Sequence, residues 1–390
     1  MPRTILPEPP PELKQLSLAL CARIREELRA DPPMPFSRFM EMALYEPGAG
    51  YYSAGLHKLG ESGDFVTAPE LGSLFAGCLS RQAAELGGVL GSYEILEIGA
   101  GTGRLAAELL DALPPNARPT RYRILERSAD LKRVQRELLS AAVPSLLERV
   151  EWIEAPPTEG WRGLLIANEV LDALAVERFR IGDGEVEQLC VQEADDGFEW
   201  ASRPAPEPLT RAVRRLQDAL GRPFPEGYRS EVNLALPAWL KAVTESLEQG
   251  LALFIDYGYP RAEYYLRERS DGTLMCHFRH RAHGDPFFWP GLQDITAWVD
   301  FTALAEAAAE SGLEVEGYAN QAMFLLGCGL DQVLAGRAGD DSGTRLSLGA
   351  EARQLTLPEM MGERFQVMGL GRGLHDPLAG FSLQDLRYRL

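Results

Sequence analysis

The sequence contains few of the residues that build covalent or metal-bound frameworks. Only five of its 390 residues are cysteines, and only five are histidines. The cysteines are scattered and none forms a C-x-x-C pair, which argues against a disulfide framework or a zinc site and predicts reduced thiols. The cysteines are Cys21, Cys78, Cys190, Cys276 and Cys328.

Basic residues and long apolar runs are also scarce. Lys and Arg number 39 against 57 Asp and Glu, which gives a net charge of −18. This balance argues against nucleic-acid binding, which needs a basic face. It suits a basic protein partner, although solubility alone is the simpler explanation. No apolar run approaches the ~20 residues of a membrane span, and the first residues lack a signal-peptide core. We therefore expect a cytoplasmic protein that does not contact membranes.

The length predicts more than one ordinary hydrophobic core. We expect one large α/β domain that carries an insertion. The predicted parts are an N-terminal helical and lid region, a first core part, a substrate-side insertion, a second core part and a C-terminal segment. They cover residues 1–92, 93–176, 177–249, 250–335 and 336–390, in that order. Within the last part, residues 336–353 predict a mobile loop or linker.

Strand and helix patterns alternate from residue 93 onward. Helices are predicted at 104–113 and 130–142, each after a strand, and such alternation is typical of a parallel sheet with helices on both faces. Ligands of such sheets bind outside the carboxyl ends of the strands. The predicted strands are 93–98, 122–126, 150–154, 164–168 and 251–256. The insertion is expected to hold strands at 176–181, 188–192 and 198–201 and helices at 209–220 and 235–249.

The stretch EIGAGTGRL, residues 97–105, forms a glycine-rich turn between a strand and a helix. Its glycines Gly99, Gly101 and Gly103 read G-x-G-x-G, whereas the dinucleotide fingerprint G-x-G-x-x-G would need glycine where Arg104 stands. Glu97 would repel a pyrophosphate but suits the cationic methionine end of S-adenosyl-L-methionine. The turn therefore favours that cofactor over a dinucleotide or a purely structural turn.

Two further strand ends carry carboxylates. Glu126 follows the second strand, where a carboxylate accepts hydrogen bonds from both ribose hydroxyls of an adenosine. This supports adenosine binding without choosing the cofactor, and a solvated strand-end glutamate is the alternative. Glu154 follows the third strand, where it could meet the adenine amino group.

The stretch LLIANEVLDALAVERF, residues 164–179, ends a buried strand in polar residues. Asn168 and Glu169 close the strand and Asp172 follows, so all three are expected to face the cofactor crevice. The alternative is a helix cap, with Asn168 at the N-cap and the two acids in the first turn. Both can hold at once.

Two more stretches allow a structural and a functional reading. Thr67 and Glu70 in GDFVTAPE form a possible capping box. His277, His280 and His283 are spaced by three, as metal ligands on a helix can be. The glycine, proline and aromatic residues around the histidines favour a loop, and no further ligand completes a shell, so we predict no metal.

The chain resembles the MidA-like family of class I S-adenosylmethionine-dependent methyltransferases. The resemblance covers roughly residues 35–330. It rests on the quoted motifs together with ALFIDYGYP at 252–260, NQAMFLLGCG at 320–329 and long segments at 50–77, 124–139 and 272–304. It implies a Rossmann-like class I methyltransferase sheet with helices on both faces. Mitochondrial members of the family dimethylate an arginine on a complex I subunit.

The resemblance also implies roles for individual residues. The loop with Thr67 and Glu70 would cover the methionine end of the cofactor. His280 would belong to a substrate-side cluster with Asp294 and Asp300, and could accept a proton. Thr102 and the bulky DPFFWPG segment depart from the family pattern, which bears on the substrate.

Methyl transfer to arginine needs alignment and local negative charge, because the guanidinium lone pair is delocalised. Glu169 and Asp172 are the candidates, assisted by Asp256 or Asp64. The predicted partner is a protein substrate, with a possible homodimer. A methyltransferase of another nucleophile, or a cofactor-binding assembly factor that acts by partner contact, are the competing hypotheses.

Overall fold

The computed structural model describes residues 6–54, 67–338 and 341–390. Two compact units are present, and each is built from separate stretches of the chain. Unit 1 comprises residues 1–65, 172–236 and 261–298, and unit 2 comprises residues 66–171, 237–260 and 299–390. The predicted insertion, 177–249, thus contributes residues up to 236 to unit 1 together with most of the predicted N-terminal region, while 237–249 belong to unit 2.

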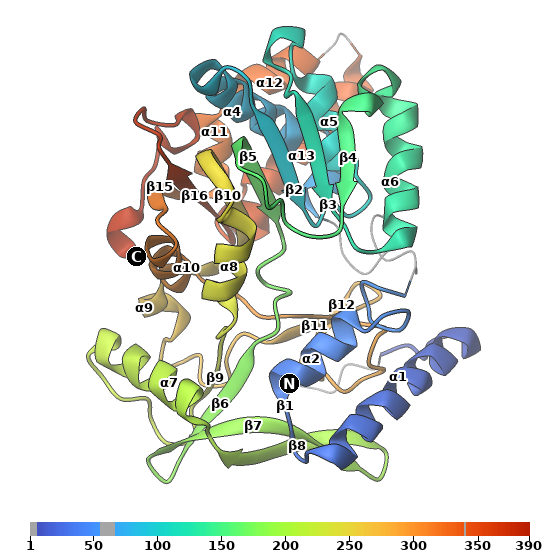
Figure 1. Cartoon of the computed structure of the whole chain (residues 1–390), viewed down its shortest axis with the longest axis vertical. Coiled ribbons are helices and arrows are strands. Elements are labelled where there is room, and N and C mark those ends of the chain that lie inside the picture. Colours follow the sequence, from blue (N-terminus) through green and yellow to red (C-terminus); the bar gives the residue numbers. More distant parts are fainter. Residues whose placement is uncertain (1–5, 55–66, 339–340) are drawn as a thin grey trace. The chain divides into compact units, whose positions relative to one another are not determined.

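Unit 2 is the α/β unit (Figure 1). Its strand order is β15-β16-β10-β5-β2-β3-β4, with β14 pairing β10 off this path. The strands are β2 (Glu94–Ile98), β3 (Arg121–Leu125), β4 (Val150–Ile153), β5 (Trp161–Asn168), β10 (Leu247–Tyr259), β14 (Val299–Asp300), β15 (Glu314–Asn320) and β16 (Phe365–Arg372). The helices are α3 (Ala68–Leu71), α4 (Leu74–Leu90), α5 (Arg104–Ala112), α6 (Ala129–Ala142), α8 (Leu236–Thr244), α10 (Phe301–Glu310), α11 (Gln321–Gly327), α12 (Leu330–Arg337) and α13 (Ser342–Thr356).

The sheet is doubly wound. The five strands from β10 to β4 are parallel, whereas β16 runs antiparallel between β10 and β15. Helices cover both faces: Leu253 and Ile255 join the core cluster that holds α4, whereas Phe254 meets Trp239 of α8. The chain leaves β2 toward β3 on one side and resumes at β5 on the other, so β2 and β5 flank the topological switch point where such sheets bind ligands.

Two predictions for unit 2 are wrong. Residues 342–356 form helix α13 instead of a loop, because Asp341 caps its first turn and Leu348 and Leu355 are buried. The predicted helix 235–249 ends at Thr244, since residues 247–249 already begin β10, which pairs β5 from Leu247 onward.

Unit 1 is built from antiparallel sheets and helices. One sheet has the order β1-β7-β6-β9 with β8 on β7, and a second has the order β12-β11-β13. The strands are β1 (Met34–Pro35), β6 (Glu177–Gly182), β7 (Glu185–Ala194), β8 (Gly197–Pro204), β9 (Arg229–Val232), β11 (Met275–Phe278), β12 (Arg281–His283) and β13 (Asp294–Thr296). The helices are α1 (Pro11–Ala30), α2 (Phe36–Tyr45), α7 (Glu207–Leu220) and α9 (Arg261–Tyr264).

The core of unit 1 is aromatic. Phe36 and Phe39 of α2 are fully buried, and their rings contact Trp200, Phe198 and Phe287. Such ring pairs add about 0.5–1.5 kcal/mol each beyond the burial of their area. The amphipathic helix α2 is therefore held on the antiparallel sheet by its aromatic face.

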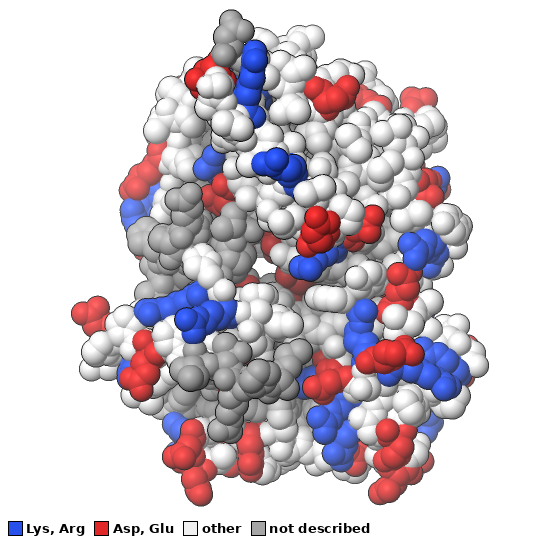
Figure 2. All heavy atoms as spheres, turned by 180° about the vertical axis from the view of Figure 1, so that it is seen from behind, with Lys and Arg blue, Asp and Glu red and all other residues white. Residues whose placement is uncertain are grey.

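The surface carries both charge signs. On the face drawn in Figure 2, acidic and basic side chains of the described residues are interspersed. All five cysteines are buried thiols without a disulfide. No helix within residues 6–54, 67–338 and 341–390 is long and apolar enough to cross a membrane.

Candidate functional site

The turn after β2 brings three left-handed residues to the switch point. Gly99, Gly101 and Gly103 have φ of +70°, +55° and +86°. Residues with a side chain rarely adopt such values, so glycine is required here. Gly103 is the N-cap of α5, and a Cβ on Gly99 would lie 3.0 Å from Cγ2 of Val170 in the turn after β5.

Glu97 lies at the end of β2 and is buried. Its Oε2 accepts a hydrogen bond of 2.6 Å from the Tyr122 hydroxyl on β3. Burial raises the pKa of Glu97 to about 7, and the Tyr122 hydrogen bond opposes the shift. A cation that approached the glycine turn would favour the ionised form of this carboxylate.

Glu126 follows β3 and is held by two donors. Its Oε1 accepts from the Ser128 amide at 2.8 Å, and its Oε2 accepts from Nε2 of Gln135 at 3.2 Å. Burial raises the pKa of Glu126, and these two hydrogen bonds oppose it. Because each carboxylate oxygen has two acceptor positions, one on each oxygen stays available for a further donor. Glu154, by contrast, is exposed and paired with Lys132.

The turn after β5 is not a helix, so the predicted helix cap is wrong. Residues 169–176 contain bends and turns, and Glu169 has a φ of +53°. The reason is Asp256, at the adjacent position on β10. Its Oδ2 accepts hydrogen bonds from the amides of Val170 and Leu171 at 3.2 and 2.9 Å, which draws this backbone out of helical geometry. A left-handed non-glycine residue costs about 1–2 kcal/mol, and such strain concentrates at functional sites.

Asn168 lies beside the glycine turn, since Ile98 of β2 pairs with Ala167 of β5. Its Nδ2 donates to Oε1 of Glu169 at 3.2 Å. Its Oδ1 is buried and accepts no hydrogen bond among the described residues. An unpaired buried acceptor costs about 1–3 kcal/mol, so this oxygen is suited to a donor on a ligand.

The segment with Thr67 and Glu70 joins the same edge. Thr67 is the N-cap of α3 but makes no side-chain capping hydrogen bond, so the predicted capping box does not form. Glu70 accepts instead from the Thr102 hydroxyl at 2.5 Å. Thr102, the departure from the family pattern, thus ties α3 to the glycine turn. Asp64 lies outside the described residues.

Two predicted catalytic residues belong to unit 1. Asp172 is buried. Burial raises the pKa of the Tyr52 hydroxyl, and the charges of Asp294, Tyr45 and Asp172 raise it further, in that order. The Tyr52 hydroxyl donates to Oδ1 of Asp294 at 2.9 Å. His280 lies exposed in the turn of the β11–β12 hairpin, with a φ of +59°. Asp300 caps α10 in unit 2.

The histidine spacing reflects this hairpin and not a helix face. His277 pairs with Ala282 and Cys276 with His283 across the two strands. Over residues 6–54, 67–338 and 341–390, no group of three or more His, Cys, Asp or Glu side chains is placed to hold a metal ion.

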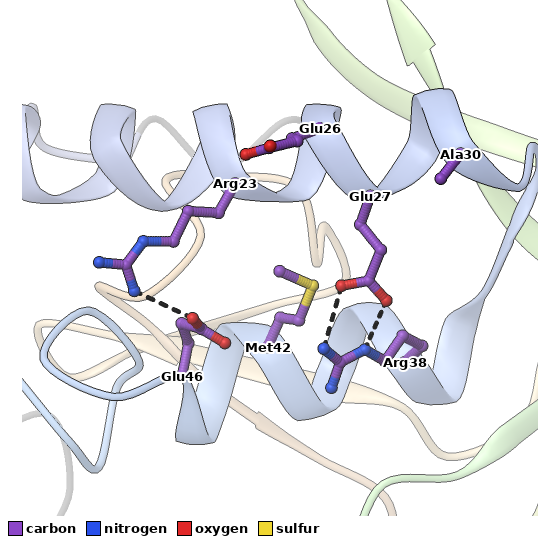
Figure 3. A pocket seen from close by; sticks show the side chains of 7 residues that line it. All are labelled: Arg23, Glu26, Glu27, Ala30, Arg38, Met42 and Glu46. Carbon is purple, nitrogen blue, oxygen red and sulfur yellow. Dashed lines mark hydrogen bonds and ion pairs between the residues drawn. The ribbon is translucent and has the colours of Figure 1, made fainter.

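A groove of about 380 Å³ lies between α1 and α2 of unit 1 (Figure 3). Its arginines are already paired: Arg23 with Glu46 at 2.9 Å and Arg38 with Glu27 at 2.7 Å. Bidentate pairing leaves the Arg38 guanidinium little capacity for an outside carboxylate. This groove is therefore not the candidate site.

Comparison with known proteins decides the family. Residues 78–319 match the family described as "Putative S-adenosyl-L-methionine-dependent methyltransferase". The chain belongs to this family of methyltransferases. The match spans both the glycine turn and the turn after β5, and it confirms the family and the cofactor that the sequence predicts. The fold class is confirmed by the crystal structure described next.

Individual relatives agree over most of the chain. A crystal structure of a "likely methyl transferase" from Burkholderia thailandensis bound to S-adenosyl-homocysteine has 41% sequence identity and a TM-score of 0.93, and the match covers 99% of this chain and 100% of that one. The mitochondrial protein arginine methyltransferase NDUFAF7 homolog of Drosophila melanogaster is 27% identical over 96% of this chain and 93% of its own length. NDUFAF7 of Homo sapiens is 25% identical over 88% and 81%. The cytoplasmic location stays a prediction, because these curated relatives carry mitochondrial names.

Proposed function

We propose that this methyltransferase transfers a methyl group to an arginine side chain of a protein. The observation that carries the proposal is the position of Glu169. Its backbone is strained at a φ of +53°, and it lies next to the unpaired Oδ1 of Asn168 and to the glycine turn. Relatives at 25–27% identity that are named protein arginine methyltransferases support the choice of nucleophile.

The residues at the carboxyl ends of β2 and β3 fit S-adenosyl-L-methionine, which supplies an electrophilic methyl group on a sulfonium when bound. In our proposal the backbone of Gly99, Gly101 and Gly103 admits its methionine end, and Glu97 balances the positive charge. Glu126 accepts from the ribose hydroxyls through its remaining acceptor positions.

Three more residues complete the proposed cofactor site. The orphaned Oδ1 of Asn168 accepts a hydrogen bond from the cofactor. Thr67 and Glu70 cover the methionine end, and Glu70 is held against the glycine turn by Thr102.

For the transfer itself, we assign alignment to Glu169 and Asp172. A guanidinium donates hydrogen bonds in a planar fork, and two carboxylates can fix that plane and hold positive charge on the nitrogens that do not react. His280 belongs to unit 1, and its role as the proton acceptor stays a prediction from the sequence. The net charge of −18 suits a basic segment of the protein substrate.

Calorimetric titration with S-adenosyl-L-methionine tests the cofactor site. We expect binding by the wild-type protein and weaker binding by Glu126→Ala, by about 10-fold or more, since hydrogen bonds to a charged group contribute about 1.5–3 kcal/mol. Glu137→Ala, which removes an exposed carboxylate of α6 that pairs with Arg133, is the matched control and should bind as the wild type does. Absence of binding at millimolar S-adenosyl-L-methionine would refute the proposed methyltransferase activity.

Proteome-wide mapping of methylated peptides after deletion of the gene tests the nucleophile. Loss of a dimethylarginine supports the proposal. Loss of a methyl-lysine points to the other nucleophile class, and an unchanged pattern of methylated peptides together with intact cofactor binding points to a small-molecule substrate or to an assembly factor. Size-exclusion chromatography with light scattering tests the predicted homodimer.

A further inference from the structure

Helix α6 buries an amide where an amphipathic helix normally buries apolar side chains. Its only buried residues are Gln135 and Leu139, and the exposed fraction of Gln135 is 0%. A buried amide has a high desolvation cost unless every donor and acceptor is paired. The burial of the Gln135 side chain must therefore be explained by the groups to which it hydrogen-bonds.

All polar groups of Gln135 are paired with three different segments of unit 2. Its Nε2 donates to the Gly101 carbonyl at 2.9 Å and to Oε2 of Glu126 at 3.2 Å. Its Oε1 accepts from the indole Nε1 of Trp152 on β4 at 2.9 Å. Carboxylates and carbonyls only accept, and an indole only donates, so the orientation of the amide is determined by its partners.

The glycine turn is shaped around the same side chain. A Cβ on Gly103 would lie 3.1 Å from Cγ and 3.2 Å from Cβ of Gln135. The lack of a side chain at Gly103 thus lets α6 come close enough for Gln135 to reach Gly101. The contacts link the turn after β2, the turn after β3 and β4.

We propose that Gln135 is a positioning residue for the cofactor: its amide sets the separation between the Gly101 carbonyl and the Glu126 carboxylate. The inference rests on the proposed roles of these two residues. In it, Gln135 touches no part of the cofactor. It holds the segment that admits the methionine end in register with the carboxylate that binds the ribose, so that neither has to reorganise on binding.

The first test measures S-adenosyl-homocysteine binding by calorimetry. Gln135→Met keeps the volume of the side chain and removes all three hydrogen bonds. We expect it to weaken binding by about 10-fold or more, in line with the loss of hydrogen bonds to a charged group. The matched control is Gln321→Met, because Gln321 is also fully buried in unit 2 and donates to the Leu355 carbonyl, away from the glycine turn. Equal affinities of the two variants would overturn the positioning role.

A double-mutant cycle tests whether the effect passes through Glu126. In a Glu126→Ala background, Gln135→Met should weaken binding by less than about threefold further, because coupled residues are not additive. Full additivity would overturn the proposal. If the wild type itself fails to bind S-adenosyl-homocysteine, the proposed cofactor site falls as well, whereas tight wild-type binding with an unaffected Gln135→Met overturns only this inference.

The variant Gln135→Glu, which has nearly the same shape as the wild type, distinguishes a loss of hydrogen bonding from a loss of folding. Gln135→Glu can donate to Glu126 only when it is protonated. We expect its S-adenosyl-homocysteine affinity to approach that of the wild type at low pH and to fall as pH rises and two carboxylates face each other. A ratio of wild-type to variant affinity that stays constant with pH contradicts the inference, since a simple packing defect does not titrate.

Discussion

The turn after β2 and the turn after β5 lie next to each other in unit 2, and both contain left-handed backbone. In the first, three glycines adopt it without a steric penalty. In the second, Glu169 adopts it with a full side chain, while Asp256 holds the amides of the next two residues. The first turn is thus preorganised by missing side chains and the second by a hydrogen-bonded carboxylate from another strand.

The difference explains why one turn can be recognised in the sequence and the other cannot. The glycine spacing is a local signal, so the sequence of residues 97–105 is enough to predict the conformation of this turn. The conformation at Glu169 depends on a residue on β10 that is distant in the chain. Four substitutions in these two turns and in the residues beside them test the difference.

Removing the carboxylate of Asp256 should have the largest effect. Asp256→Ala leaves the amides of Val170 and Leu171 without their acceptor, and each unpaired buried group costs about 1–3 kcal/mol. We expect a loss of at least about 3 kcal/mol in the free energy of unfolding, measured with urea. Asp341→Ala, which removes an exposed helix cap in the same unit, should cost about 1 kcal/mol. A loss of the same size in both variants would show that Asp256 does not hold the turn.

A side chain in the first turn should abolish cofactor binding. Gly101→Leu forces a leucine to a φ of +55° and fills the space next to the turn. We expect S-adenosyl-homocysteine affinity to fall by about 100-fold or more. The left-handed leucine should lower the free energy of unfolding by only about 1–2 kcal/mol. Gly221→Leu is the control, because Gly221 has a φ of +63° with no atom near its Cβ and ends α7 in unit 1. Unchanged affinity of Gly101→Leu would exclude the turn from the site.

The ionisation of Glu97, next to the first turn, should make the free energy of unfolding depend on pH. The pKa of Glu97 is raised to about 7 in the folded protein from 4.5. Its folded form therefore binds a proton more tightly than its unfolded form, and this contribution to stability is lost as pH rises from below 4.5 through about 7. Glu97→Gln should be more stable than the wild type at pH 8, by on the order of 2 kcal/mol, and lose this advantage near pH 4. Urea unfolding at both pH values measures it, and a difference independent of pH would contradict the assignment.

Replacing Glu169 by glycine should make the second turn resemble the first. Glu169→Gly relieves the left-handed strain and should raise the free energy of unfolding by about 1 kcal/mol, while methyl transfer falls. Cofactor affinity should change less than turnover with the substrate found by methyl mapping. Glu169→Gln, which keeps the strain and removes the charge, separates the two effects. Lower stability of Glu169→Gly would mean that the side chain, and not the backbone, is what the fold requires.

The strands and helices from 93 to 168 follow from the sequence because apolar strands alternate there with amphipathic helices. Glu126 and the glycine turn follow for the same reason. Gln135 does not, since a glutamine on an amphipathic helix predicts exposure, and only the tertiary structure brings it to Gly101. The glycines and polar residues of 342–356 predicted a loop, although this segment is a helix that its buried Leu348 and Leu355 stabilise.

The antiparallel strand β16 has a consequence for the synthesis of the chain. Leu251 on β10 pairs with Gly371 on β16, which also pairs with Glu314 on β15. Until residues 365–372 have been synthesised, β10 lacks its antiparallel neighbour and β15 lacks the strand with which it pairs. The sheet of unit 2 can be completed only after residues 365–372 emerge, and until then β10, which pairs with β5 at the border of the proposed site, keeps an unpaired edge.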